Sequence, residues 1–145
     1  MATVFTQIMT GKIPGTFVWA DDVCCAFATI EPLSDGHLLL VPREEYDSYW
    51  TAPADTVAHM ARVAQVLSRA QIAAFDCVRV GQIVAGFDVP HLHIHLVPLT
   101  DQGQLSLSRA KAGDPAQIAA ACAKIRDALV AAGEGDHVID SAPLA

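Results

Sequence analysis

Three histidines alternate with apolar residues in the segment 91–97, which reads His-Leu-His-Ile-His-Leu-Val. A neutral imidazole near pH 7 can act as a nucleophile, move a proton or bind a metal. A period of two predicts a β-strand with Leu92, Ile94 and Leu96 in a core and the histidines on the other face. The chain has only six histidines in 145 residues. Three of them in register therefore indicate an active site.

A metal site is one chemistry that this pattern allows, because imidazole is a ligand for zinc and iron. Geometry limits it. Residues 91 and 95 of one strand lie roughly 13 Å apart, so they cannot share one ion through bonds of about 2 Å. Two of the three histidines could bind an ion if His37 or Asp88 supplied a third ligand.

Nucleophilic catalysis at phosphorus is the second chemistry, and it suits a row of three imidazoles better. His93 would attack, and its other ring nitrogen would be held by a hydrogen-bond acceptor that fixes the tautomer. His91 and His95 could donate to phosphoryl oxygens, since phosphoryl transfer depends mostly on positioning and charge stabilisation. Three purely structural histidines form a third interpretation, which their common register makes less favourable.

Hydrophobic periodicity predicts the elements that must position the histidines. We expect helices over 4–11, 54–75 and 115–132, and strands over 17–20, 23–30, 37–41, 77–85 and 91–98. Asp114 is a good N-cap and Pro115 suits the first helical position. Residues 100–113 are expected to form a polar loop. The prediction is one α+β domain over 1–145, with an antiparallel sheet of about five strands and two main helices.

Composition narrows the class of protein. Hydrophobic residues make up 52% of the chain, charged residues 17%, and the formal net charge is −7. No basic face for duplex nucleic acid is visible, and no apolar run has the length of a membrane span. The four cysteines form no CxxC pair and no signal peptide is apparent, which predicts a cytoplasmic protein with reduced thiols. The apolar excess indicates either a large core or apolar surface that is buried against a second subunit.

The chain resembles the histidine triad (HIT) superfamily, whose motif is His-φ-His-φ-His-φ-φ with φ apolar. Residues 91–97 match this motif at every position. Upstream, 36–42 (Gly-His-Leu-Leu-Leu-Val-Pro) and 26–32 (Ala-Phe-Ala-Thr-Ile-Glu-Pro) resemble the third and second strands of the family. Residues 5–8 with 13–14 resemble its opening. The resemblance covers about 4–98, the core that bears the motifs.

The resemblance implies an α+β homodimer whose sheets join across the two-fold axis. Such proteins bind nucleotides and hydrolyse or transfer them at the α-phosphate through a covalent nucleotidyl-histidine. By position, His93 would be the nucleophile and His91 would hold it through its backbone carbonyl. His95 would contact the phosphate or the leaving group, and His37 would support His91 and His93. The uridylyltransferase branch typically has Gln where this chain has His95, which argues against that branch.

The resemblance also implies a nucleotide pocket, which includes Val4, Phe5, Ile8, Phe27, Thr29, Ile30, Gly86 and Asp88. Two of these depart from the family pattern. Thr29 stands where relatives carry an acidic or amide residue for the ribose hydroxyls, and Asp88 brings a carboxylate near the phosphate. Gln82 is a candidate replacement for an amide that relatives have before the triad. Thr6 stands where some bacterial relatives have a zinc-binding Cys, so we expect no structural zinc.

The sequence therefore predicts a nucleotide hydrolase or nucleotidyl transferase of the phosphoramidate or dinucleoside polyphosphate type. No cofactor is expected to be required, although a divalent metal could accompany the substrate phosphates. One alternative is a metal-dependent enzyme or metal-binding domain that uses two triad histidines. A second is a nucleotide-binding regulator with little turnover.

Overall fold

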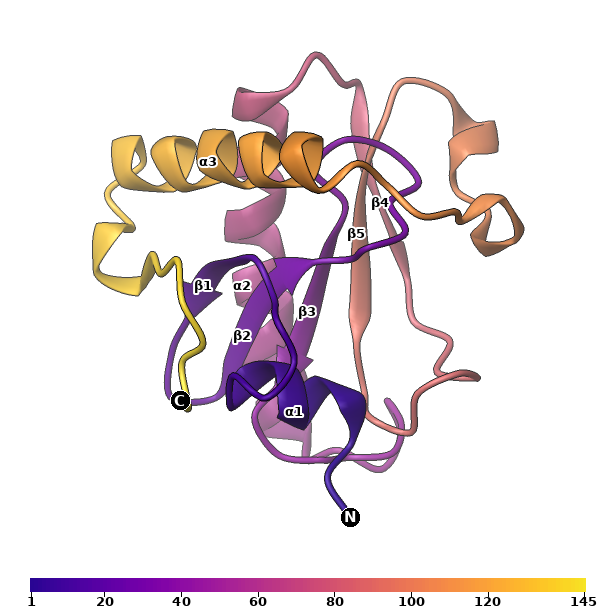
Figure 1. Ribbon diagram of the computed structural model, residues 1–145, viewed down its shortest axis with the longest axis vertical. Coiled ribbons are helices and arrows are strands. Elements are labelled where there is room, and N and C mark those ends of the chain that lie inside the picture. Colours follow the sequence, from indigo (N-terminus) through magenta and orange to yellow (C-terminus); the bar gives the residue numbers. More distant parts are fainter.

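A five-stranded antiparallel sheet with the order β1-β2-β3-β5-β4 forms the centre of the computed structural model, which describes residues 1–145 (Figure 1). The strands are β1 (Phe17–Ala20), β2 (Cys24–Ala28), β3 (Leu38–Pro42), β4 (Arg79–Ile83) and β5 (Ile94–Leu99). The helices are α1 (Val4–Met9), α2 (Ala54–Ala74) and α3 (Pro115–Ala131). The predicted α+β class, with about five strands and two main helices, is confirmed.

The two faces of the sheet are covered by different helices. Residues of α2 and α3 share a cluster of 17 buried residues with one face, and α1 shares a cluster of 7 with the other. Figure 1 shows α2 behind the sheet and α1 in front of it. Side chains alternate between the faces, so Cys24 lies on the side of α2 and Cys25 on the side of α1. Leu92, Ile94 and Leu96 pack on the α2 side, as the alternation predicted.

The two long helices have nearly the bounds that the sequence predicts, and α3 also has clear sequence signals at both ends. Asp114 accepts a hydrogen bond from the Ala116 backbone N–H and thus caps α3, with Pro115 in the first turn. Gly133 follows the helix with a positive φ of 86°, a conformation that glycine adopts at little cost. The predicted bounds of 54–75 and 115–132 differ from the observed ones by a single residue at each C-terminus.

The strand of the histidines is shorter than predicted. β5 begins at Ile94, and both His91 and His93 precede it. Pro90 has no backbone N–H to give to a neighbouring strand. The His91 backbone N–H donates to Val89, within its own loop. The alternation of histidines and apolar residues therefore begins before β5, in the segment between the turn at Pro90 and the first residue of the strand.

The segment 100–113 was predicted to be a polar loop, and it contains two short 3₁₀ helices, Gln102–Gln104 and Leu107–Arg109. Its end contacts the loop after β2, where the Gly113 N–H donates to the Ile30 carbonyl over 2.9 Å. This contact places the end of the segment beside the loop that follows β2. None of the helices is both long enough and apolar enough to cross a membrane.

The strand β4 lies at one edge of the sheet and is paired only with β5. An open edge invites a further strand, and exposed apolar side chains flank this one: Val78 is 62% exposed and Val84 is 41% exposed. We predict that two copies of the chain join at β4. Light scattering at micromolar concentration should give about twice the 15.4 kDa chain mass. The double variant Val78→Lys/Val84→Lys should be folded and monomeric, and a monomeric wild-type protein would contradict the prediction.

Candidate active site

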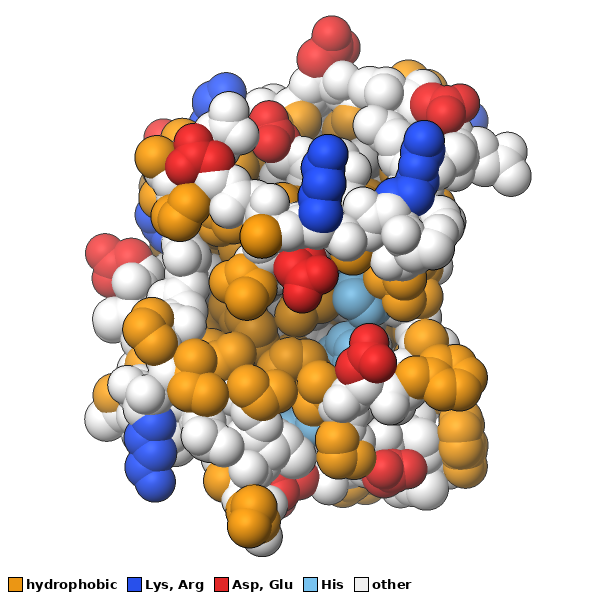
Figure 2. Space-filling view, turned by 45° about the vertical axis from the view of Figure 1, so that its right-hand side comes forward, with side chains coloured by type: hydrophobic (Ala, Val, Ile, Leu, Met, Phe, Trp, Pro, Cys, Tyr) orange, Lys and Arg blue, Asp and Glu red, His pale blue; other side chains and the backbone are white.

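An open pocket of about 710 Å³ lies on the α1 side of the sheet, and Figure 2 shows histidine side chains in a hollow bordered by hydrophobic ones. Its walls come from α1, the loops after α1 and β2, the start of β3, the loop before the triad, and the segment 107–118. The structure gathers every predicted nucleotide contact around this pocket: Val4, Phe5, Ile8, Phe27, Thr29, Ile30, Gly86 and Asp88. His37, His93 and His95 also line it, whereas His91 does not.

His93 presents one free ring nitrogen to the pocket. Its Nδ1 lies 2.8 Å from the backbone carbonyl of His91, which can only accept a hydrogen bond. The proton of the neutral ring therefore sits on Nδ1, and the lone pair sits on Nε2. Phe5 packs edge-on against the ring with centroids 4.8 Å apart. The predicted contact between His93 and the His91 carbonyl is confirmed.

His91 is fully buried and anchors the segment behind the pocket. Its Nε2 donates to the Pro42 carbonyl over 2.8 Å, so its Nδ1 is an acceptor and receives the Thr3 hydroxyl proton over 2.7 Å. Thr3 is also the N-cap of α1. The side chain of His91 therefore links the triad to β3 and to α1, while its carbonyl orients His93.

His37 pairs with His95, not with His91 and His93 as predicted. The Leu33 backbone N–H donates to His37 Nδ1 over 3.0 Å, so the proton of His37 is on Nε2. That nitrogen lies 2.9 Å from His95 Nδ1 and donates to it. The proton of His95 must then be on Nε2. The prediction was wrong because His37 precedes β3, and the β3–β5 register pairs Leu39, two residues further on, with His95.

Burial keeps these rings neutral. It lowers the pKa of His37 to about 3 and that of His95 to about 4, and each pKa is lowered further by a neighbouring histidine. The pKa of His93 is also lowered by burial, although the His91 carbonyl and the Asp88 carboxylate oppose this shift. At neutral pH the site therefore combines a nucleophilic nitrogen on His93 with an N–H donor on His95.

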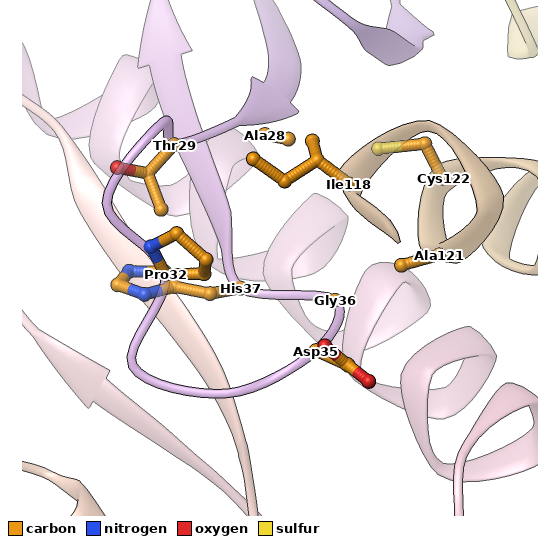
Figure 3. Close-up of a pocket in the computed structure, with 9 residues that line it drawn as sticks. All are labelled: Ala28, Thr29, Pro32, Asp35, Gly36, His37, Ile118, Ala121 and Cys122. Carbon is orange, nitrogen blue, oxygen red and sulfur yellow. The ribbon is translucent and has the colours of Figure 1, made fainter. Parts of the chain in front are cut away.

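A small cavity of about 10 Å³ lies behind His37, between its loop and α3 (Figure 3). Figure 3 shows Gly36 and His37 on one side of it, and Ile118 and Cys122 on the other. The volume is that of about one water molecule. The loop of His37 is thus packed against α3, and His37 can reach a ligand only from the larger pocket.

The profile of the HIT domain matches residues 10–102. The chain belongs to the HIT family. It is 30% identical to an uncharacterized HIT-like protein of Methanocaldococcus jannaschii, over 66% of this chain and 77% of that protein. It is also 30% identical to the adenylylsulfatase HINT3 of Arabidopsis thaliana, over 74% of this chain but only 57% of HINT3. A zinc-bound histidine triad family protein from Mycobacterium smegmatis has the same fold, with a TM-score of 0.81, 26% identity, and coverage of 93% and 98%.

The pocket of this HIT protein contains negative but no positive side chains. Glu31 and Asp88 are among the 26 lining residues, and none of the 26 is Lys or Arg. The sequence analysis did not single out Glu31, although it lies two positions after Thr29, whose hydroxyl oxygen accepts from the Glu31 N–H.

One wall of the pocket was also missed in the sequence. It is formed by Leu107 and other residues up to 118, which the contact between Gly113 and Ile30 brings next to the loop after β2. Gln82 is exposed and pairs with Leu96 on the α2 side, so it does not replace the missing amide.

A metal site built on the triad finds little support in the geometry. Only two triad ring nitrogens, Nε2 of His93 and Nε2 of His95, are without a partner in the chain. The one group of three potential ligands within 4.8 Å of one another is Asp21, Cys24 and His59, on the other side of the sheet. The Asp21 carboxylate there already accepts from His59 and from the Trp19 indole, as well as from two backbone N–H groups. The expectation that no metal is required stays a prediction.

The lowered pKa of His93 predicts the pH dependence of turnover. The Nε2 lone pair is lost when the ring is protonated, so kcat/KM should fall on the acid side only below pH 6.5, the ordinary histidine value. The Asp88→Asn variant should move this fall to still lower pH, because the carboxylate favours the protonated ring. Asp47→Asn, at an exposed site outside the pocket, should leave the profile unchanged. A wild-type acid limb at or above pH 6.5 would contradict the assignment.

Proposed function

We propose that this HIT protein hydrolyses nucleotide conjugates at the α-phosphorus through a nucleotide linked covalently to His93, and that it favours an amine leaving group. The observation that carries the proposal is the hydrogen bond from His93 Nδ1 to the His91 carbonyl. This bond leaves the nucleophilic Nε2 of His93 facing a 710 Å³ pocket. The N–H of His95 lies in the same pocket, and the similarity to HINT3, which is named an adenylylsulfatase, supports hydrolysis of a nucleotide conjugate without indicating the leaving group.

The reaction proceeds in two displacements at phosphorus. In the first, the Nε2 lone pair of His93 forms a bond to phosphorus, the bond from phosphorus to the amine nitrogen breaks, and the amine leaves with the electron pair and takes a proton from solvent. In the second, water attacks phosphorus, the phosphorus–Nε2 bond breaks, and the lone pair returns to His93. The water proton passes to solvent. The N–H of His95 can donate to a phosphoryl oxygen as charge develops on it.

The nucleoside part of the substrate would lie against α1. Phe5, Ile8 and Phe27 provide apolar surface for a base, as expected for a ligand pocket. The Thr29 hydroxyl and the Glu31 carboxylate border the same space and can bind ribose hydroxyls. A carboxylate forms stronger hydrogen bonds than a neutral hydroxyl, so Glu31 can supply the charge that Thr29 lacks.

The leaving group is inferred from charge. A dinucleoside polyphosphate brings several negative charges, which phosphoryl-transfer sites usually offset with Lys, Arg or a metal ion. This pocket has no Lys or Arg in its lining and has Asp88 and Glu31, so such a substrate would need to carry its own divalent ion. An amine linked to phosphorus adds no negative charge, and an amine with a further cationic group is attracted by the carboxylates.

The His93→Ala variant tests the nucleophile. Turnover of a nucleoside 5′-phosphoramidate should fall at least about 1,000-fold because the covalent route is lost, while thermal unfolding should stay close to that of the wild type. Rapid quench and mass spectrometry should find one nucleoside monophosphate on His93 in the wild-type protein. His137→Ala removes a histidine that packs on Trp19 outside the pocket, and it should retain turnover.

Two outcomes would count against the proposal. Near-wild-type rates in His93→Ala would exclude the covalent route. If the wild-type protein binds nucleotides tightly but shows neither turnover nor an adduct, the alternative function is favoured, namely a nucleotide-binding regulator with little turnover.

The leaving-group preference predicts the effect of Asp88. In Asp88→Asn, kcat/KM for a dinucleoside triphosphate should rise about tenfold relative to that for a phosphoramidate with a cationic amine, because one repulsive charge is removed. The change should be larger at low salt than at high salt, where the Debye length is shorter. Asp47→Asn serves as the matched control. An unchanged ratio between the two substrates at low salt would show that Asp88 does not select the leaving group.

A further inference from the structure

Gln71 is a polar residue in the apolar stripe of α2. It follows Met60, Ala64 and Leu67 on the buried side of the helix, and it is 0% exposed. Burying an amide is unfavourable when it lacks hydrogen-bond partners. A methionine or leucine would avoid this cost, so the contacts of the Gln71 amide need an explanation.

The amide of Gln71 works only as a donor. Its Nε2 donates to the Gly36 carbonyl over 2.8 Å and to the Leu96 carbonyl over 3.0 Å. Both partners are carbonyl oxygens, so only the nitrogen of the amide fits between them. The Oε1 atom is buried without a partner. Gln71 therefore donates two hydrogen bonds through Nε2 while its Oε1 stays unpaired, and a buried unpaired acceptor is unfavourable.

The two carbonyls belong to residues next to the catalytic histidines. Gly36 directly precedes His37, and Leu96 directly follows His95. Gly36 lies just outside β3, whose pairing with β5 starts at Leu38. It has a φ of 85°, and a Cβ at this position would overlap the Phe75 ring at the end of α2. The end of α2 thus fixes the loop of His37 to β5 through a hydrogen-bonded clamp.

We propose that Gln71 is a positioning residue for the His37–His95 pair, acting from the α2 side of the sheet. By holding the Gly36 and Leu96 carbonyls on one nitrogen, it keeps His37 Nε2 at 2.9 Å from His95 Nδ1. This distance lets His37 donate to His95 and confines the proton of His95 to the Nε2 that faces the pocket. The inference rests on the proposed function only for its effect on turnover.

The test combines ring-nitrogen spectroscopy with kinetics. In the wild-type protein without substrate, ¹⁵N spectra should show His95 protonated on Nε2 only, with a coupling across the hydrogen bond to His37. Gln71→Met has a similar length and no donor. It should give a mixture of His95 tautomers, and kcat should fall about tenfold with KM changed less than about twofold. Gln65→Met, an exposed site on the same helix, should change neither readout.

Each result decides the inference. A folded Gln71→Met that keeps the single His95 tautomer would overturn it, even if the protein were less stable, because the residue would then be merely structural. If Gln71→Met does not fold, the inference is tested by spectra of the wild-type protein alone. Couplings from Gln71 ¹⁵Nε2 to both carbonyl carbons support the clamp, and their absence overturns it. These spectra need no substrate, so a wild-type protein without turnover would refute the proposed function and leave this test intact.

Discussion

The hydrogen bond from His37 to His95 depends on both rings being neutral, and the arrangement of the site follows from this condition. A neutral imidazole has one donor and one acceptor nitrogen, so a fixed neighbour on one nitrogen determines the state of the other. The Leu33 N–H makes this choice for the His37–His95 pair, and the His91 carbonyl makes it for His93. Two backbone groups thus determine that His95 carries its proton on Nε2 and that His93 has its lone pair on Nε2.

Neutrality is in turn a result of the layered fold. Helices α2 and α3 fill one face of the sheet and α1 covers part of the other, and His37, His91 and His93 are buried in this arrangement. The charged form of a histidine is poorly solvated there, and the pKa of each ring falls. Phe5 contributes twice, because it packs against both His91 and His93. The apolar wall that can receive a base therefore also helps to keep His93 Nε2 unprotonated.

Local patterns in the sequence were sufficient to predict the elements and the row of three histidines, because each depends on residues close together in the chain. The hydrogen bond from His93 to the His91 carbonyl was predicted only from the resemblance to the HIT family. Other features required contacts that no local pattern specifies. The partner of His37 depends on the register between β3 and β5. Leu107 enters the pocket wall because Gly113 binds the Ile30 carbonyl. Gln71 was not singled out in the sequence, and its amide donates to carbonyls 35 and 25 residues away.

Neutral histidines beside two carboxylates leave the site without a fixed positive charge at neutral pH. Phosphate must then be bound by N–H dipoles such as that of His95, which are strong only where water is excluded. One negative charge at the α-phosphorus can be accommodated in this way, whereas each further phosphate adds repulsion from Asp88 with nothing in the pocket lining to offset it. Under the proposed function, the burial that keeps His93 Nε2 unprotonated and the carboxylate of Asp88 would together favour a substrate with a single negative charge at the reacting phosphorus.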